Sequence, residues 1–210
     1  MPTPLLTREQ LLSRLCETFR HYGYEGASMA RIAAATGLGK ASLYHHFPEG
    51  KRQMAAAVLD WAIQWFEEHV FAPLKSTHPP RQRIVAMLDS LSDYYALGQC
   101  ACLPALLGLG AEREMFADAI HAFYQRWLDA LAQALTDSGL ARDIAQRRAY
   151  DALERIQGAL VLSRGLKDVR LFGEMAAVLP DQLLTGAGRS TVWTTRMPSI
   201  PPRPAIKRVG

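Results

Sequence analysis

Apolar side chains recur along this chain every three or four residues, the spacing that places them on one face of an α-helix. This pattern predicts helices over residues 7–23, 29–36, 39–47, 49–71, 81–97, 112–136, 143–165 and 168–184. A further short, buried helix is expected within the apolar stretch 100–110. No stretch alternates apolar and polar residues as a half-buried strand would. We therefore expect an all-α protein.

The first helix is expected to begin at Thr7, which can form a capping box with Gln10, and to end at Gly23. Its apolar stripe is expected to contain Leu12, Leu15, Phe19 and Tyr22. This helix should cover the pair of short helices that follows it.

Residues 28–47 read as two short helices joined by a tight turn. Ser28 can cap the first helix, and Gly37 suits the left-handed turn that ends it. Gly39 can begin the second helix, in which Leu43 and Phe47 are four residues apart and face the same core. The spacing predicts a helix-turn-helix, and the alternative is a helix pair that belongs to a larger bundle.

The second helix of this pair leaves a face that carries hydrogen-bond donors and no carboxylate. The residues on or near that face are Lys40, Ala41, Ser42, Tyr44, His45 and His46. Phosphates and the acceptor-rich edges of bases in the major groove require donors of this kind. The face is therefore suited to double-stranded DNA.

The run IAAATGLGKASLYHHF resembles the DNA-binding domain of the TetR family of transcriptional regulators, and the resemblance covers about residues 7–60. Gly39 and Ala41 depart from the family pattern, which has Ser and Gly at these positions. The FPEGK segment has one residue more than the commonest form, as in the LmrA/YxaF-like branch. The resemblance implies phosphate contacts by Ser28, Ser42, Tyr44, His45, His46 and Lys51, with Lys40 and Ala41 as candidates for reading bases.

The helix over residues 49–71 is apolar around much of its circumference, so its first half can pack on the DNA-binding domain and its second half inside a bundle. We expect an N-terminal helix-turn-helix domain of three helices at 1–52 and a C-terminal helical bundle for ligand binding and dimerisation at 53–185. A flexible basic tail is expected at 186–210.

A set of aromatic residues, with one methionine and one leucine, in the second domain has two interpretations. The family resemblance implies a cavity for a small hydrophobic or aromatic ligand, whereas helical spacing alone is typical of an ordinary core. The residues concerned are Trp61, Trp65, Phe66, Met87, Leu91, Tyr94, Tyr95, Phe116, Phe123 and Trp127.

The last two predicted helices carry small and apolar residues that would let another helix approach closely. The family resemblance implies a homodimer in which two such helices from each subunit form a four-helix bundle. The candidate interface consists of Ala149, Ala152, Leu153, Ile156, Leu160, Phe172, Met175 and Leu179. Packing within one chain is equally compatible with this spacing.

The net charge of +4 is unevenly distributed along the chain. Residues 1–60 carry seven Lys/Arg and five Asp/Glu, residues 61–185 carry twelve and fifteen, and residues 186–210 carry five and none. Positive charge near the helix-turn-helix and in the tail suits a nucleic-acid partner. No apolar run is long enough to span a bilayer and no leader pattern is present, so we expect a cytoplasmic protein with reduced cysteines.

Enzymatic, metal and cofactor sites are not expected. Adjacent His45 and His46 point about 100° apart on a helix, and the other histidines lack partners at ligand spacing. Cys100 and Cys102 are interpreted as structural thiols, with a thiol sensor as the alternative. We expect a dimeric repressor that binds a palindromic operator and is released by a small ligand. The alternative is a regulator without a ligand, whose second domain only dimerises or binds a protein partner.

Overall fold

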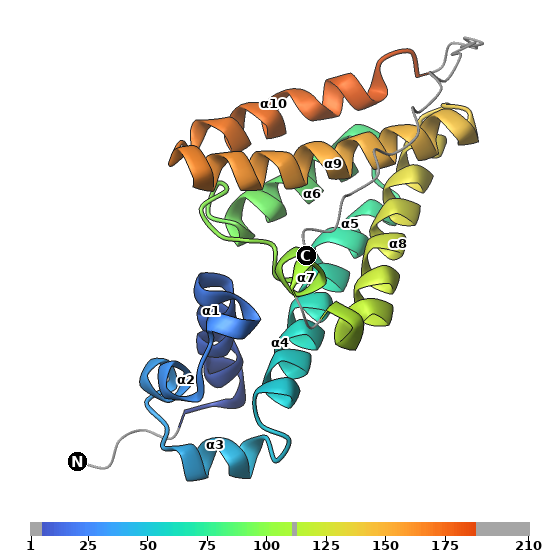
Figure 1. The fold of residues 1–210 in the computed structure, drawn as a ribbon. Coiled ribbons are helices and arrows are strands. Elements are labelled where there is room, and N and C mark those ends of the chain that lie inside the picture. Colours follow the sequence, from blue (N-terminus) through green and yellow to red (C-terminus); the bar gives the residue numbers. More distant parts are fainter. Residues whose placement is uncertain (1–5, 111–112, 188–210) are drawn as a thin grey trace, which may run out of the picture.

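The structure is a computed structural model that describes residues 6–110 and 113–187, and these residues form helices joined by short connections (Figure 1). No strand occurs among them, which confirms the all-α prediction. The elements are α1 (Arg8–Gly26), α2 (Met29–Thr36), α3 (Lys40–His46), α4 (Lys51–Phe66), the π-helical segment η1 (Glu67–Phe71), α5 (Ala72–Leu74), α6 (Pro80–Tyr94), α7 (Leu103–Leu109), α8 (Arg113–Asp137), α9 (Arg142–Leu166) and α10 (Arg170–Leu184).

Helix α1 begins as its sequence predicts. The Thr7 hydroxyl accepts a hydrogen bond from the Gln10 N–H at 3.2 Å, and the Gln10 side chain accepts one from the Thr7 N–H at 3.0 Å. Gly23, with φ 69°, interrupts the helix, and one further turn follows it. Tyr22 was expected in the buried stripe, but it is 42% exposed because its ring lies at the surface under the guanidinium of Arg31.

Helix α4 starts at Lys51, two residues later than predicted, and continues through η1 into α5 without a break. Pro73 explains the π-helical segment. In a regular α-helix its ring would press on the carbonyl of His69, four residues earlier. The wider turn, in which the Ala72 N–H donates to the carbonyl of Glu67, directly precedes the proline and accommodates it.

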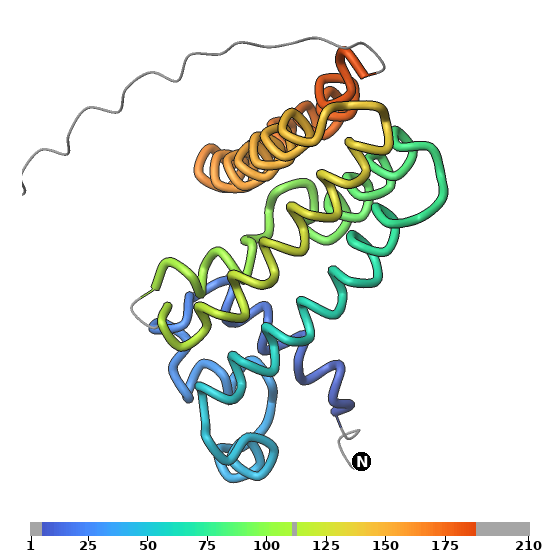
Figure 2. Tube along the Cα trace, turned by 90° about the vertical axis from the view of Figure 1, so that its right-hand side faces the viewer, coloured from blue at the N-terminus to red at the C-terminus, as the bar shows by residue number. Residues whose placement is uncertain are grey.

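The buried side chains form two hydrophobic clusters. The N-terminal cluster combines α1, α2, α3 and the first half of α4 with residues from α7 and the start of α8. The C-terminal cluster lies among α4 to α6 and α8 to α10. Helix α7 packs against α1, α4 and α8, so it joins the two clusters. Figure 2 shows α9 and α10 at one end of the molecule and the N-terminal helices at the other.

The predicted domain limits remain a prediction. The limit after residue 52 falls inside α4, which contributes side chains to both clusters. The basic tail expected at 186–210 lies outside the described residues from position 188 onward.

Helix α6 ends at Tyr94, so the predicted end at Leu97 is wrong. Ala96 and Leu97 have positive φ angles of 46° and 52°, and Gly98 follows with φ 91°. A Cβ atom on Gly98 would lie 2.8 Å from the Cβ of Ser163 and 3.0 Å from the Cβ of Phe172. The chain therefore turns where only a glycine fits against α9 and α10.

The predicted dimer residues lie inside the chain's own core. Their exposed fractions are 9% or less, and the residues are Ala149, Ala152, Leu153, Ile156, Leu160, Phe172, Met175 and Leu179. They face the interior because α9 and α10 pack on each other and on α8 and α6. Side chains buried to this extent offer little surface to a second subunit, and their burial favours the alternative of packing within one chain.

Candidate nucleic-acid interface

Short-range contacts fix the turn between α2 and α3. The Ser28 hydroxyl caps α2 by accepting a hydrogen bond from the Arg31 N–H at 3.3 Å. The buried Thr36 hydroxyl donates to the carbonyl of Ile32 at 2.7 Å and accepts from the Leu38 N–H at 3.3 Å. Gly37 adopts the left-handed conformation, with φ 72° and ψ 10°. The predicted helix-turn-helix geometry is therefore present.

Helix α3 is held by two side chains and presents the others to solvent. Leu43 and Phe47 are buried in the N-terminal cluster, as predicted. The six residues expected on the outer face, Lys40, Ala41, Ser42, Tyr44, His45 and His46, are all exposed. Lys40 forms no ion pair with any residue in 6–110 or 113–187, so its charge is available to a partner.

Arg31 adds an exposed cation at the start of α2 that sequence reasoning missed. Its guanidinium donates to the carbonyl of Gly26 at 2.7 Å and lies 4.4 Å from the centroid of the Tyr22 ring. Both contacts hold an exposed positive charge near the capping residue Ser28. The available signal in the sequence was the position of Arg31 in the first turn of α2, three residues after its cap.

Lys51, at the start of α4, is half-buried and tied to α1. Its ammonium donates to the carbonyl of Tyr24 at 3.0 Å and lies 4.3 Å from the centroid of the Tyr24 ring. An ammonium has three N–H donors, so the bond to Tyr24 leaves donors for a phosphate. Gly50, with φ 66°, makes the turn into α4 under the ring of Tyr44.

The aromatic residues predicted to line a ligand cavity do not all lie together. Trp61 and Phe116 belong to the N-terminal cluster, and the others belong to the C-terminal cluster. Trp61, Trp65 and Tyr94 are half-buried, whereas the remaining members are buried. The ring centroid of Phe66 lies 4.9 Å from that of Phe123 and 5.2 Å from that of Trp127. In this structure the central rings pack directly on one another.

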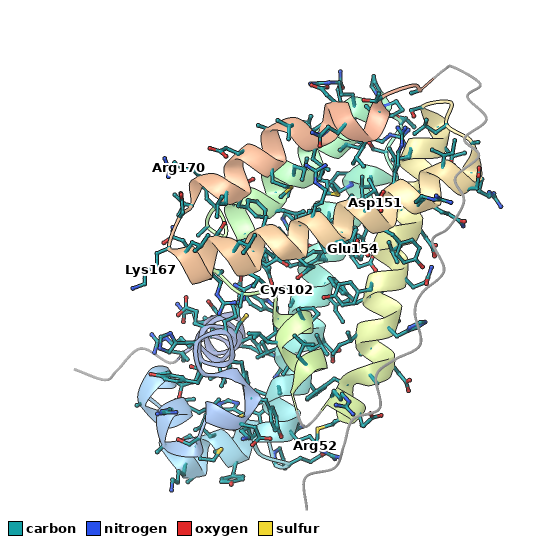
Figure 3. The ribbon with its side chains drawn as sticks, turned by 45° about the horizontal axis from the view of Figure 1, so that its top comes forward. Arg52, Cys102, Asp151, Glu154, Lys167 and Arg170 are labelled. Atoms are coloured by element: carbon teal, nitrogen blue, oxygen red, sulfur yellow. The ribbon has the colours of Figure 1, made fainter. Side chains whose placement is uncertain are left out.

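The three thiols are free and lie at the junction of the two clusters. Cys102 is buried, and its sulfur is 3.5 Å from the Gln157 side-chain nitrogen of α9 and 3.9 Å from the Tyr124 hydroxyl. Figure 3 shows Cys102 between α9 and the start of α7. Burial raises the pKa of the Cys16 thiol, and the nearby Arg20 cation opposes this shift only in part. A raised pKa disfavours the reactive thiolate form of Cys16.

Metal binding and membrane insertion are two other possibilities for this chain. No group of three or more His, Cys, Asp or Glu side chains in residues 6–110 and 113–187 could hold a metal ion. Within the same ranges, no helix is both long and apolar enough to cross a membrane. The exposed face of α3 carries six of the predicted binding residues.

Comparisons with known proteins agree with this geometry. Residues 11–58 match the family model for bacterial regulatory proteins of the tetR family, and residues 80–178 match the model for the C-terminal domain of LmrA/YxaF-like transcriptional regulators. The chain is 27% identical to the HTH-type transcriptional regulator LmrA of Bacillus subtilis over 84% of its own length and 96% of that protein. It is 34% identical to the HTH-type transcriptional activator FasR of Mycolicibacterium smegmatis over 41% of the chain and 39% of that protein. Among solved structures, a TetR transcriptional regulator from Legionella pneumophila is similar with a TM-score of 0.72 at 18% identity, covering 86% of this chain and 99% of that one.

Proposed function

Because the chain belongs to the TetR family of transcriptional regulators, a family of DNA-binding proteins, we propose that it binds a palindromic operator as a homodimer. We further propose that it represses transcription until a small hydrophobic or aromatic ligand lowers its affinity for DNA. The observation that carries the DNA-binding role is the outer face of α3. This face presents donors and a free cation, while Leu43 and Phe47 anchor the helix from behind.

Each member of the predicted set has a role in this proposal. Lys40 and Ala41 read bases, the latter through contact with a thymine methyl group. The remaining residues position the phosphates, and they are Ser28, Ser42, Tyr44, His45, His46 and Lys51. The cation of Arg31 adds a further phosphate contact next to Ser28.

Replacing Lys40 with alanine is expected to reduce the preference for the operator over unrelated DNA by about 5- to 150-fold, because a good side-chain contact to a base contributes about 1 to 3 kcal/mol of discrimination. The measurement is fluorescence anisotropy with two duplexes, one that the wild-type protein selects from a random-sequence library and one scrambled. Lys75→Ala is the matched control, since it removes the same charge from an exposed site at the far end of α5. Equal effects of the two variants would refute base reading by Lys40.

The homodimer proposal now rests on the exposed side of α9 and α10. Tyr150, Val161, Leu162 and Leu166 are 53% to 68% exposed on α9, and Val178 is 45% exposed on α10. Gly158 and Gly165 of α9 have open space where a Cβ atom would lie, so a second helix can approach closely there. Figure 3 shows that α9 also carries the acidic residues Asp151 and Glu154, so polar side chains accompany the apolar ones along this helix. Burying the apolar side chains would favour self-association.

A double change of Val161 and Leu162 to glutamate is expected to weaken dimerisation at least about 100-fold, because each new charge would be buried without a partner. Analytical ultracentrifugation of the full chain measures the dissociation constant directly. Leu109→Glu is the control, as Leu109 is 84% exposed and lies on α7, away from this face. A double variant that remains as dimeric as the control would show that the subunits meet elsewhere.

Support for a ligand comes from the aromatic cluster around α4. Trp65 and Tyr94 are half-buried and stack at 4.1 Å between ring centroids, so this edge of the cluster is accessible from the surface. A ligand there would contact the helix whose other end follows α3. The close packing of Phe66, Phe123 and Trp127 favours the second candidate, a regulator whose C-terminal bundle only dimerises or binds a protein partner.

A further inference from the structure

Arg20 of α1 connects the DNA-binding helices with the C-terminal bundle. Its guanidinium carbon lies 4.4 Å from the centroid of the Tyr94 ring and 6.0 Å from that of Tyr95, at the end of α6. Tyr94 in turn stacks on Trp65 of α4. One cation from the N-terminal unit therefore meets the aromatic edge of the bundle.

These rings do not supply hydrogen-bond acceptors for all the N–H donors of the guanidinium. Its Nε and Nη2 atoms are shielded from solvent and have no hydrogen-bond partner among the described residues. The same is true of the Tyr94 hydroxyl. Arg20 also forms no salt bridge within residues 6–110 and 113–187. The groups near enough to influence its charge are the phenols of Tyr94 and Tyr95 and the thiols of Cys16 and Cys100, and no carboxylate is among them.

The identity of the two nitrogen atoms indicates what would satisfy them. Nε–H and one Nη2–H point in parallel from one edge of the planar guanidinium, and this edge matches the two oxygens of a carboxylate. Arg20 is half-buried, and the burial of its Nε and Nη2 donors without partners is costly, so an anion with this geometry would be bound favourably. The Tyr94 hydroxyl can donate a third hydrogen bond to the same group.

The surroundings indicate the rest of such a ligand. The Tyr94 ring stacks on Trp65 with an interplanar angle of 23°, and Phe66 meets Tyr94 edge-on at 5.4 Å between centroids. Flat aromatic groups pack well against side chains in these arrangements. We propose that the effector of this regulator is an aromatic carboxylate, held by the Nε and Nη2 edge of Arg20 and by the Tyr94 hydroxyl. This inference rests on the proposed release of DNA by a small molecule and specifies its chemical class.

A ligand at this site would contact the DNA-binding unit directly, through α1. Arg20 is on α1, which packs against α2 and α4, while Tyr94 is on α6 of the bundle. A carboxylate bound by the edge of Arg20 and by the Tyr94 hydroxyl would change the contact between α1 and α6 directly. The ligand lowers the affinity for DNA if it binds more tightly to the arrangement of helices that cannot bind DNA than to the arrangement that can.

The test compares two acids with their neutral isosteres, 2-naphthoate with 2-naphthamide and benzoate with benzamide, and includes inorganic phosphate. Binding to the full chain is measured by tryptophan fluorescence, and release of the selected duplex is measured by anisotropy. We expect at least one acid to bind with a dissociation constant at least about tenfold lower than that of its amide. The same acid should release the duplex at a correspondingly lower concentration. Arg20→Gln should abolish this difference, and Tyr94→Phe should reduce it. Arg8→Gln, an exposed change on the same helix, should leave it intact.

The possible outcomes separate this inference from the proposed function. Amides that release DNA as well as the acids would support a ligand-controlled regulator and overturn the carboxylate site. Phosphate that binds as tightly as the acids would overturn the aromatic part of the inference. Failure of every probe to bind a protein that still binds its duplex would overturn the site altogether. Should Arg20→Gln not fold, Arg20→Lys keeps the charge but lacks the paired edge, so it must bind the acids more weakly than the wild type and show a smaller preference for them.

Discussion

Replacing Phe47 with alanine is expected to abolish operator binding and to lower the free energy of unfolding by about 3 to 5 kcal/mol. Phe47 is 1% exposed and packs in the N-terminal cluster directly after α3. Its removal leaves a cavity behind the helix that carries Lys40, so α3 loses the support that orients its outer face. Urea unfolding followed by circular dichroism gives the stability, and anisotropy with the selected duplex gives the affinity.

Tyr44→Ala is the matched control for this prediction. Tyr44 is 48% exposed on α3, so its loss should change the free energy of unfolding by no more than about 0.5 kcal/mol while it weakens DNA binding. The two variants therefore separate support of the helix from contact with phosphate. A Phe47→Ala protein with wild-type stability and affinity would contradict the packing described for α3.

A second large effect is expected from Trp127→Ala, which should lower the free energy of unfolding by about 3 to 5 kcal/mol. Trp127 is fully buried, its indole N–H lies 3.5 Å from the sulfur of Met87, and its ring contacts Phe66, Phe71 and Phe123. Chemical denaturation measures the change. Trp127→Phe keeps most of the volume and should lose less stability.

The size of the Trp127 effect also discriminates between the two interpretations of the aromatic cluster. A loss below about 1 kcal/mol would mean that the ring lies against space that can relax, as in a ligand cavity. A loss in the expected range would mean that the central rings form a dense core. In that case the ligand must bind at the half-buried edge formed by Trp65 and Tyr94.

The helix-turn-helix was predictable from sequence because its determinants are local. Ser28, Gly37 and the pair Leu43 and Phe47 act within a few residues of their own positions, and the structure has each of them in the expected role. The end of α6 was not predictable in this way. The left-handed residues Ala96 and Leu97 follow from the packing of the next glycine against α9 and α10, which are distant in sequence.

The predicted dimer residues show a different limit of sequence reasoning. Helix α9 has apolar residues on two sides, and the periodic pattern does not reveal which side faces the chain's own core. The small residues Ala149 and Ala152 face inward, whereas Gly158 remains open to solvent. The contact between Arg20 and Tyr94 was equally hidden, because no local pattern indicates that these two helices meet.

The unbroken run of α4, η1 and α5 would move as one rigid rod if it tilted at its end in the bundle. About 16 residues separate Lys51 from the start of η1, which corresponds to roughly 24 Å of helix. A tilt of about 5° around η1 would move the Lys51 end by roughly 2 Å. In the proposed two-fold dimer, tilts directed along the line between the recognition helices would change their separation by up to about 4 Å, against a DNA repeat of about 34 Å. Under the proposed ligand control, a small rearrangement beside Trp65 would therefore produce a mismatch with the spacing of consecutive major grooves.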